Sequence, residues 1–118
     1  MPSASQHLSQ ARINERVAHT LVVGKLLDWA VTALFYAALH YVDAYLAKQE
    51  EHPHNHEQRR YAVGLYFDAE TAACYGALEK ASRRTRYDCF DPTADEYDKT
   101  KLMLFDPVKK AALALQGA

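Results

Sequence analysis

The sequence is poor in the residues that build disulfide scaffolds, tight turns and sheets. Its 118 residues include two cysteines, four glycines and four prolines. Two cysteines make no disulfide framework, so we expect Cys74 and Cys89 to be reduced thiols. No segment alternates polar and apolar residues for long, which argues against β-strands. The formal net charge of −1 gives no overall attraction to nucleic acids or membranes, although local basic patches can still bind them.

Signals for targeting and repetition are also lacking. The N-terminal segment, residues 1–5, has no basic and apolar leader, and no internal repeat or low-complexity stretch follows. The length fits one domain spanning residues 1–118, which can bury a core without disulfides. We therefore expect a single cytoplasmic domain with no membrane partner.

One apolar segment, residues 28–48, dominates the chain. Between Trp29 and Val42 only Thr32 and His40 are clearly polar. The segment is too long for a typical strand and rich in Ala and Leu, which favours a helix. A helix that is apolar on nearly all sides is buried in a bundle or a membrane, and this one falls short of the roughly 20 apolar residues of a membrane span. We expect a buried central helix capped by Asp28.

The segments on either side carry the signals of further helices. A serine near the N-terminus can cap a first helix that runs to about Val23, with Ile13, Val17 and Leu21 on its buried face. Asn55 can cap a third helix, and small residues between positions 69 and 77 can face the central helix in a fourth.

Thr93 and Glu96 form a capping box for the last helix. Pro107 would either kink that helix or begin a separate segment capped by Asp106. The predicted fold is an all-α, up-and-down bundle of four to five helices.

Three stretches of the chain have a recognisable order. Residues 34–46 combine an aromatic pair and Ala with a His and an Ala-Leu tail. His54 and His56 follow a short polar loop, and residues 81–88 run from Ser-Arg to Arg-Tyr-Asp. In this order they resemble the HEPN domain, a helical family found in partners of prokaryotic nucleotidyltransferases and in several ribonucleases. The resemblance spans about residues 28–90. It implies a homodimer that binds RNA, a nucleotide or a nucleotidyltransferase partner protein.

The chain departs from the catalytic members of that family. They resemble one another in an Arg followed, four to six residues later, by a polar residue and a His, and this chain has no His after His56. The remaining candidates for catalysis are His56 with Arg83 or Arg86, brought together in space. Arg12 and His19 have a comparable spacing on the first helix, where the family motif is not expected and a solvated charged face is the plainer interpretation.

A basic and aromatic group of residues is the best candidate for binding. Arginines beside aromatic rings suit phosphate contacts and base stacking. Alternatively, the same arginines stabilise a helix end and pair with nearby acidic residues. His40 either lines a cleft with Tyr36 or is hydrogen-bonded in the core. The predicted binding residues are Tyr36, His40, Arg60, Arg83, Arg84, Arg86 and Tyr87.

No cofactor motif is present. His52, His54 and His56 lie close to glutamates and could attract a transition metal, but a structural zinc site requires four ligands at fixed geometry. We therefore expect no dedicated metal site. Two functions follow: a non-catalytic HEPN-like interaction module, or a metal-independent ribonuclease of the toxin type. Because the expected Arg and His pair is missing, the sequence favours the module and leaves open whether the protein is an enzyme.

Overall fold

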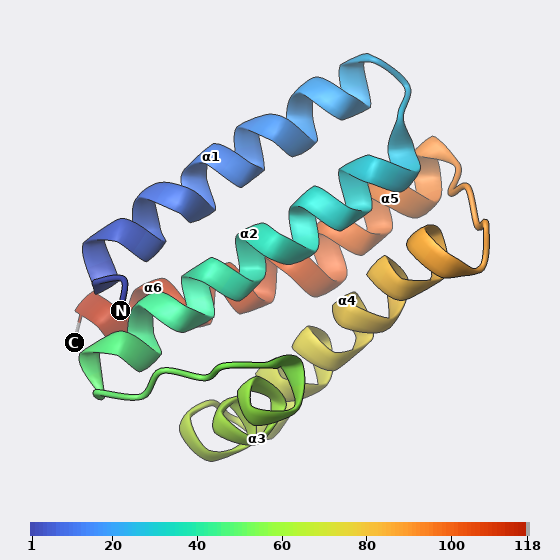
Figure 1. Cartoon of the computed structure of the whole chain (residues 1–118). Helices are drawn as coiled ribbons and strands as arrows, with labels where there is room; N and C mark the ends of the chain where they lie inside the picture. The colour runs from blue at the N-terminus through green and yellow to red at the C-terminus, as the bar shows by residue number, and fades with distance from the viewer. Residues whose placement is uncertain (118) are drawn as a thin grey trace.

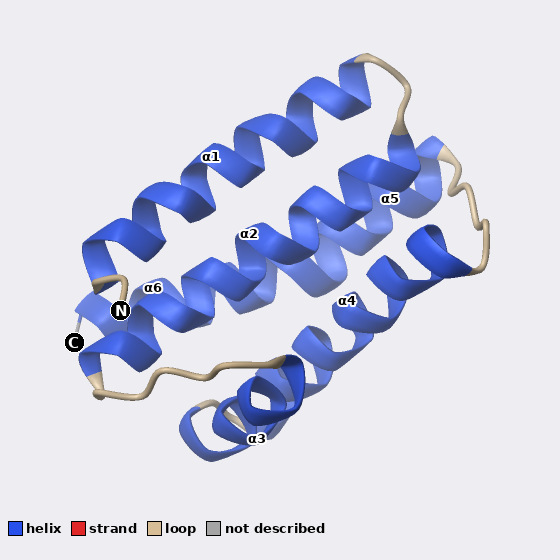
Figure 2. Cartoon of the chain, viewed as in Figure 1, coloured by secondary structure: helices blue, strands red, loops and turns tan. Residues whose placement is uncertain are grey.

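The computed structural model describes residues 1–117, and they form an all-α bundle (Figure 2). No strand occurs in residues 1–117, as the lack of alternating residues predicted. In chain order the elements are α1 (Ala4–Val23), α2 (Leu27–Lys48), α3 (His56–Tyr66), α4 (Ala69–Tyr87), α5 (Ala94–Thr100), η1 (Lys101–Phe105) and α6 (Asp106–Gly117).

The central position of α2 confirms the main prediction. In Figure 1, α1 and α4 lie on opposite sides of α2, and α5 and α6 run behind it. Leu34, Leu39 and Ala44, which lie on three different sides of α2, are all buried. The helix has the length and hydropathy of a membrane span, but 72% of its most apolar window is buried inside the bundle. In this structure α2 is therefore the core helix of the bundle.

The helix starts follow the predicted capping residues, with one exception. Ser3, Asn55 and Thr93 each accept a hydrogen bond from a backbone N–H of the first turn that they cap, and Asp68, for which no cap was predicted above, does the same for α4. The prediction for Asp28 was wrong. Because α2 begins at Leu27, the Asp28 carboxylate lies within the first turn, where it accepts a hydrogen bond from the next backbone N–H, at 2.8 Å.

Three helices end in a left-handed residue that is not glycine. Lys25, Glu50 and Cys89 have φ angles of 61°, 59° and 54° and follow α1, α2 and α4. At each end the next backbone N–H returns to a carbonyl of the last turn, as in Leu26 N–H to Leu21 O at 2.8 Å. These tight corners satisfy carbonyls that the helix itself leaves free.

The helix around Pro107 contains a π-helical turn, which neither alternative predicted for Pro107 had included. Residues 101–105 widen into a π-helical turn, and the N–H of Asp106 donates to the carbonyl of Lys101, five residues earlier. A proline in a helix lacks one N–H and crowds the preceding turn, and a π turn relieves both problems. The helix therefore continues through Pro107 without a break, and Phe105 is fully buried.

Two predicted buried faces were partly wrong. On α1, Ile13 and Val17 are 40% and 44% exposed, and Ala11 and Ala18 are buried instead. Small residues let two helix axes approach closely, so alanines lie at the contact with α2. On α4 the larger Tyr75 and Leu78 are buried and Ala73 is exposed, because a large side chain removes more apolar area from water.

Candidate functional site

A buried carboxylate on α4 brings several predicted residues together. Glu79 is only 4% exposed. Arg60 on α3 donates from Nη1 to Glu79 Oε2 at 2.8 Å. The Arg83 guanidinium, one turn further along α4, lies 3.9 Å from the same oxygen. His56 Nδ1 lies 3.9 Å from it as well. We call these four residues the Glu79 cluster.

His56 is held at the first turn of α3 beside two aromatic rings of α2. Its ring centroid lies 5.9 Å from that of Phe35 and 6.5 Å from that of Tyr36. Burial lowers the pKa of His56; the nearby carboxylate of Glu79 opposes this effect, and the charges of the neighbouring arginines add to it. The lowered pKa favours a neutral imidazole, which can accept a proton more readily than it can donate one.

Arg86 connects the end of α4 to α2. Its Nη1 donates to the hydroxyl of Tyr36 at 2.8 Å, and its guanidinium carbon lies 5.7 Å from the centre of that ring. The ring of Tyr87 lies 5.4 Å away. The Nε of Arg86 is buried and has no hydrogen-bond partner within residues 1–117. The charge of Arg86 also acts on His56, so Arg86 and Tyr36 adjoin the Glu79 cluster.

The neighbouring Arg59 has a structural role. Its guanidinium makes two hydrogen bonds to Asp43 on α2, at 2.8 and 3.0 Å, and both side chains are buried. A buried charge requires such a partner. Arg59 therefore holds α3 against α2 and leaves Arg60 as the arginine of α3 that reaches the surface.

His40 has other neighbours than Tyr36. Its Nδ1 lies 3.0 Å from Nδ1 of His7 on α1, which makes one ring the donor and the other the acceptor. Burial lowers the pKa of both histidines. Hollows lined by these two rings open near the N-terminus of the chain. Of the two interpretations of His40, the structure favours the hydrogen-bonded one.

Arg84 is also separate from the other predicted binding residues. Its guanidinium carbon lies 4.0 Å from the centre of the Phe90 ring, and it lines a small hollow with Val31 and Pro92. Arg83 and Arg86 are three positions apart, close to one helical turn, whereas Arg84 lies about 100° away from Arg83 around α4. The arginines of the basic segment thus divide between two faces.

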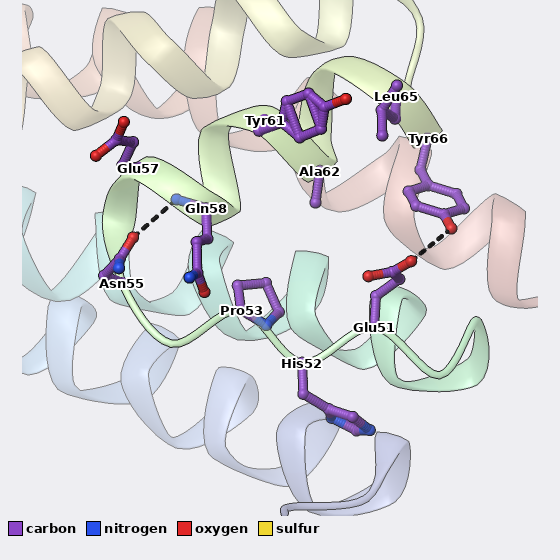
Figure 3. Close-up of a pocket in the computed structure, with 10 residues that line it drawn as sticks. All are labelled: Glu51, His52, Pro53, Asn55, Glu57, Gln58, Tyr61, Ala62, Leu65 and Tyr66. Carbon is purple, nitrogen blue, oxygen red and sulfur yellow. Dashed lines mark hydrogen bonds between the residues drawn. The ribbon is translucent and has the colours of Figure 1, made fainter.

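A further hollow lies along α3 and has the opposite charge. It has a volume of about 640 Å³ and lies between α3 and the loop that precedes it (Figure 3). Glu51 and Glu57 contribute carboxylates, Tyr61 and Tyr66 contribute rings, and the Tyr66 hydroxyl donates to Glu51 at 3.1 Å. No arginine or lysine lines it, so it does not serve the predicted contacts to phosphate.

The three histidines considered for a metal do not converge. His52 points away from α3 in Figure 3, and His56 belongs to the Glu79 cluster. In residues 1–117 no group of three or more His, Cys, Asp or Glu side chains is placed to hold a metal ion.

Some residues of the site were not predicted. Glu79 was considered only as an ion-pair partner, although its spacing of four from Arg83 indicated a shared face. Asp43 lies within the apolar segment, and a charge there indicates a buried partner. His7 had no signal, because a lone histidine on a polar helix face resembles a solvated one.

Comparison with known proteins neither supports nor contradicts the resemblance to the HEPN domain, which still rests on the sequence stretches that suggested it. No protein-family model matches the chain, and no curated protein matches it.

Proposed function

We propose that the protein is a non-catalytic, HEPN-like interaction module that binds single-stranded RNA in the cytoplasm. The observation that carries this proposal is the gathering of three arginines from two helices on one face, beside Tyr36 and His56. Guanidinium groups suit phosphate oxygens because they present several donors in a fixed fork.

The balance of charge supports an anionic ligand. In the contacts described above, Arg60 and Arg83 share one carboxylate, that of Glu79, while Arg86 contacts the rings of Tyr36 and Tyr87, which leaves two positive charges in excess among these contacts. The side chains of Arg60 and Arg83 are 44% and 56% exposed, so they can reach a phosphate without unfolding the site. The buried carboxylate of Glu79 holds the guanidinium groups of Arg60 and Arg83 side by side.

The aromatic neighbours favour unpaired RNA over a duplex. Tyr87 is 75% exposed beside Arg86, and Tyr36 accepts the hydrogen bond from Arg86. Single-stranded nucleic acid is bound by rings on which bases stack, next to a basic groove that follows the backbone. In a duplex the bases are stacked on one another, so they are not free to stack on these aromatic side chains.

We further propose that the protein forms a homodimer and that a nucleotidyltransferase is its partner protein, as the resemblance implies. Large apolar side chains remain exposed on several elements, among them Ile13 and Val17 on α1, Tyr61 and Leu65 on α3, and Leu102 on η1. Exposed apolar surface of this kind is what a second copy can cover. Light scattering over a range of concentrations measures the mass in solution, and a single-chain mass throughout contradicts the dimer.

The ribonuclease is the second candidate, because the structure places His56 near both Arg83 and Arg86. A histidine can transfer protons to or from the 2′-hydroxyl, and an arginine can stabilise charge on the phosphorus centre. We prefer the module because the Nδ1 of His56 faces Glu79 and Glu79 is already paired with Arg60.

Binding of labelled single-stranded RNA, measured by fluorescence anisotropy, tests the proposal. Arg83→Gln and Arg86→Gln should each weaken binding and lower the slope of log K against log salt, by about 0.7 for each phosphate that is no longer neutralised. Arg84→Gln is the matched control, since Arg84 lies on the other face. Equal weakening in all three variants would show a non-specific charge effect and contradict the site.

Incubating the same RNA with the protein in chelator separates the two candidates. The module predicts intact RNA for the wild-type protein. Cleavage by the wild-type protein that both His56→Gln and Arg86→Gln abolish would instead establish the ribonuclease.

A further inference from the structure

A second hollow lies directly beside Arg86, where α2 begins and α4 ends. Its volume is about 350 Å³, near the small end of ligand pockets. The face of α2 contributes Asp28, Trp29 and Thr32, and the end of α4 with the following loop contributes Thr85, Arg86 and Asp91. Arg86 therefore belongs both to this hollow and to the basic face described above.

Trp29 is unusual among the residues that line this hollow, because it is a large aromatic side chain that remains exposed. It is the single tryptophan of the chain and is 57% exposed, although it lies on the most deeply buried helix. An indole ring exposed beside an arginine is a surface on which a nucleic-acid base can stack. In the same hollow, the hydroxyls of Thr32 and Thr85 lie 3.3 Å apart and bond to each other, so they already have hydrogen-bond partners.

The carboxylates of Asp28 and Asp91 decide which part of a nucleotide can enter. Ionised carboxylates only accept hydrogen bonds, and they repel a phosphate. Asp91 is exposed, with no hydrogen-bond or ion-pair partner within residues 1–117. Such acceptors suit the exocyclic amino groups of adenine, cytosine and guanine, whereas uracil presents carbonyl oxygens in their place.

We infer that this hollow is a base-binding subsite, in which one unpaired base carrying an amino group stacks on Trp29 while its phosphate contacts Arg86. This inference rests on the proposed binding of RNA and adds a specificity to it. The protein discriminates against uracil at this position, because the carbonyl oxygens of uracil would face carboxylates.

The fluorescence of Trp29 reports on this site in the intact chain, since no other tryptophan contributes. Short single-stranded oligomers of cytidine, adenosine or uridine are titrated at low salt, and both tryptophan emission and the anisotropy of a labelled oligomer are followed. Oligocytidine and oligoadenosine should quench the emission and bind more tightly than oligouridine. In the same titration they should protect Cys89, which lines the hollow, from a thiol reagent.

Two substitutions separate stacking from base choice. Trp29→Ala should weaken binding of oligocytidine at least fivefold, the lower limit for removal of one stacked base. Tyr61→Ala, which removes a similarly exposed ring on α3, is the matched control and should change nothing. Asp91→Asn should reduce the preference for cytidine over uridine, because an amide also donates. Circular dichroism verifies that each variant is folded.

The outcomes distinguish this inference from the proposed function. Oligomers that bind by anisotropy without changing the emission of Trp29 overturn the subsite and leave RNA binding standing, and so does equal affinity for uridine. If no oligomer binds, the proposed function fails, and cytidine monophosphate at millimolar concentration then tests the hollow alone. Quenching by the monophosphate but not by uridine monophosphate supports the subsite, and no quenching overturns it.

Discussion

The buried pair of Asp43 and Arg59 shows how one polar contact can fix the position of the site. Asp43 lies in the C-terminal third of α2, and its two hydrogen bonds to Arg59 form a buried polar link to α3. Arg60 follows Arg59 directly, so the pair also sets where Arg60 meets Glu79. A charge left alone at this depth would be costly because water cannot replace its partner.

Asp43→Asn should therefore destabilise the protein strongly. We expect the free energy of unfolding in urea to fall by about 3–5 kcal/mol, because Arg59 keeps a buried charge without its counterion. The double change Asp43→Leu with Arg59→Met should cost less than the sum of the two single changes. Lys101→Met, which breaks an exposed pair with Asp106, is the control and should cost less than about 1 kcal/mol.

The pair of His7 and His40 makes stability depend on pH. Burial lowers the pKa of both rings below the ordinary 6.5, with Asp43 opposing and Arg59 adding to the effect, and His52 also faces His7. The unfolded chain therefore takes up protons at a higher pH than the folded chain does. Stability should be complete above the unfolded pKa and should fall as the pH drops through about 6.5 and below.

Urea midpoints measured between about pH 8 and pH 5 test this dependence. The slope should become smaller in the double variant His7→Gln with His40→Gln, although His56 still contributes because its pKa is also lowered. A slope that is unchanged in the double variant would show that other groups cause it.

At the residue scale the sequence predicted types of contact better than partners. Arginines beside tyrosines indicated a basic aromatic face, and Tyr36 and Arg86 do meet. Arg84 was grouped with them because adjacent positions look alike in a sequence, whereas on a helix they point in different directions. Partners such as Glu79 with Arg60 depend on how α3 packs against α4, which no local pattern encodes.

At the scale of elements, the helix starts were predictable because capping is local. The side chain of Asn55 accepts a hydrogen bond from Gln58 N–H, three residues on, at 2.8 Å. The buried faces of α1 and α4 were less predictable, since they depend on the shape of α2. Ala11 and Ala18 lie against it, although Ile13 and Val17 are the more hydrophobic residues.

Asn55→Ala should lower the free energy of unfolding by about 1 kcal/mol, the typical cost of removing a capping side chain. It should also weaken RNA binding, because His56 and Arg60 follow in the first turns of α3. Asn14→Ala is the control: Asn14 lies inside α1, and its side chain accepts a hydrogen bond from the Gln10 side chain at the surface. If both variants unfold at the same urea concentration, the cap contributes little.

At the scale of the whole molecule, α2 connects every other helix. It packs against α1, α3, α4, α5, η1 and α6. Polar contacts add to this, since Glu15 on α1 accepts hydrogen bonds from Tyr41 on α2 and from Lys109 on α6. The central apolar segment made this arrangement predictable, because a helix that is apolar on all sides must be covered on all sides.

The protein should therefore unfold in one cooperative transition. Urea curves from far-ultraviolet circular dichroism, which reports on helices, should coincide with those from the near-ultraviolet signal of the eight tyrosines. Two separated transitions would mean that part of the bundle, such as α3, unfolds independently of α2.

The left-handed corners at Lys25 and Glu50 imply that the protein can be made to withstand more heat without any change to its interior. An ordinary side chain in that backbone conformation costs about 1–2 kcal/mol, and glycine avoids the cost but loses part of the gain to the greater freedom of its unfolded state. Lys25→Gly and Glu50→Gly should each raise the melting temperature by a few degrees, measured by calorimetry. Lys80→Gly, within α4, should lower it. The corners thus offer thermostability at positions that are not part of the basic face.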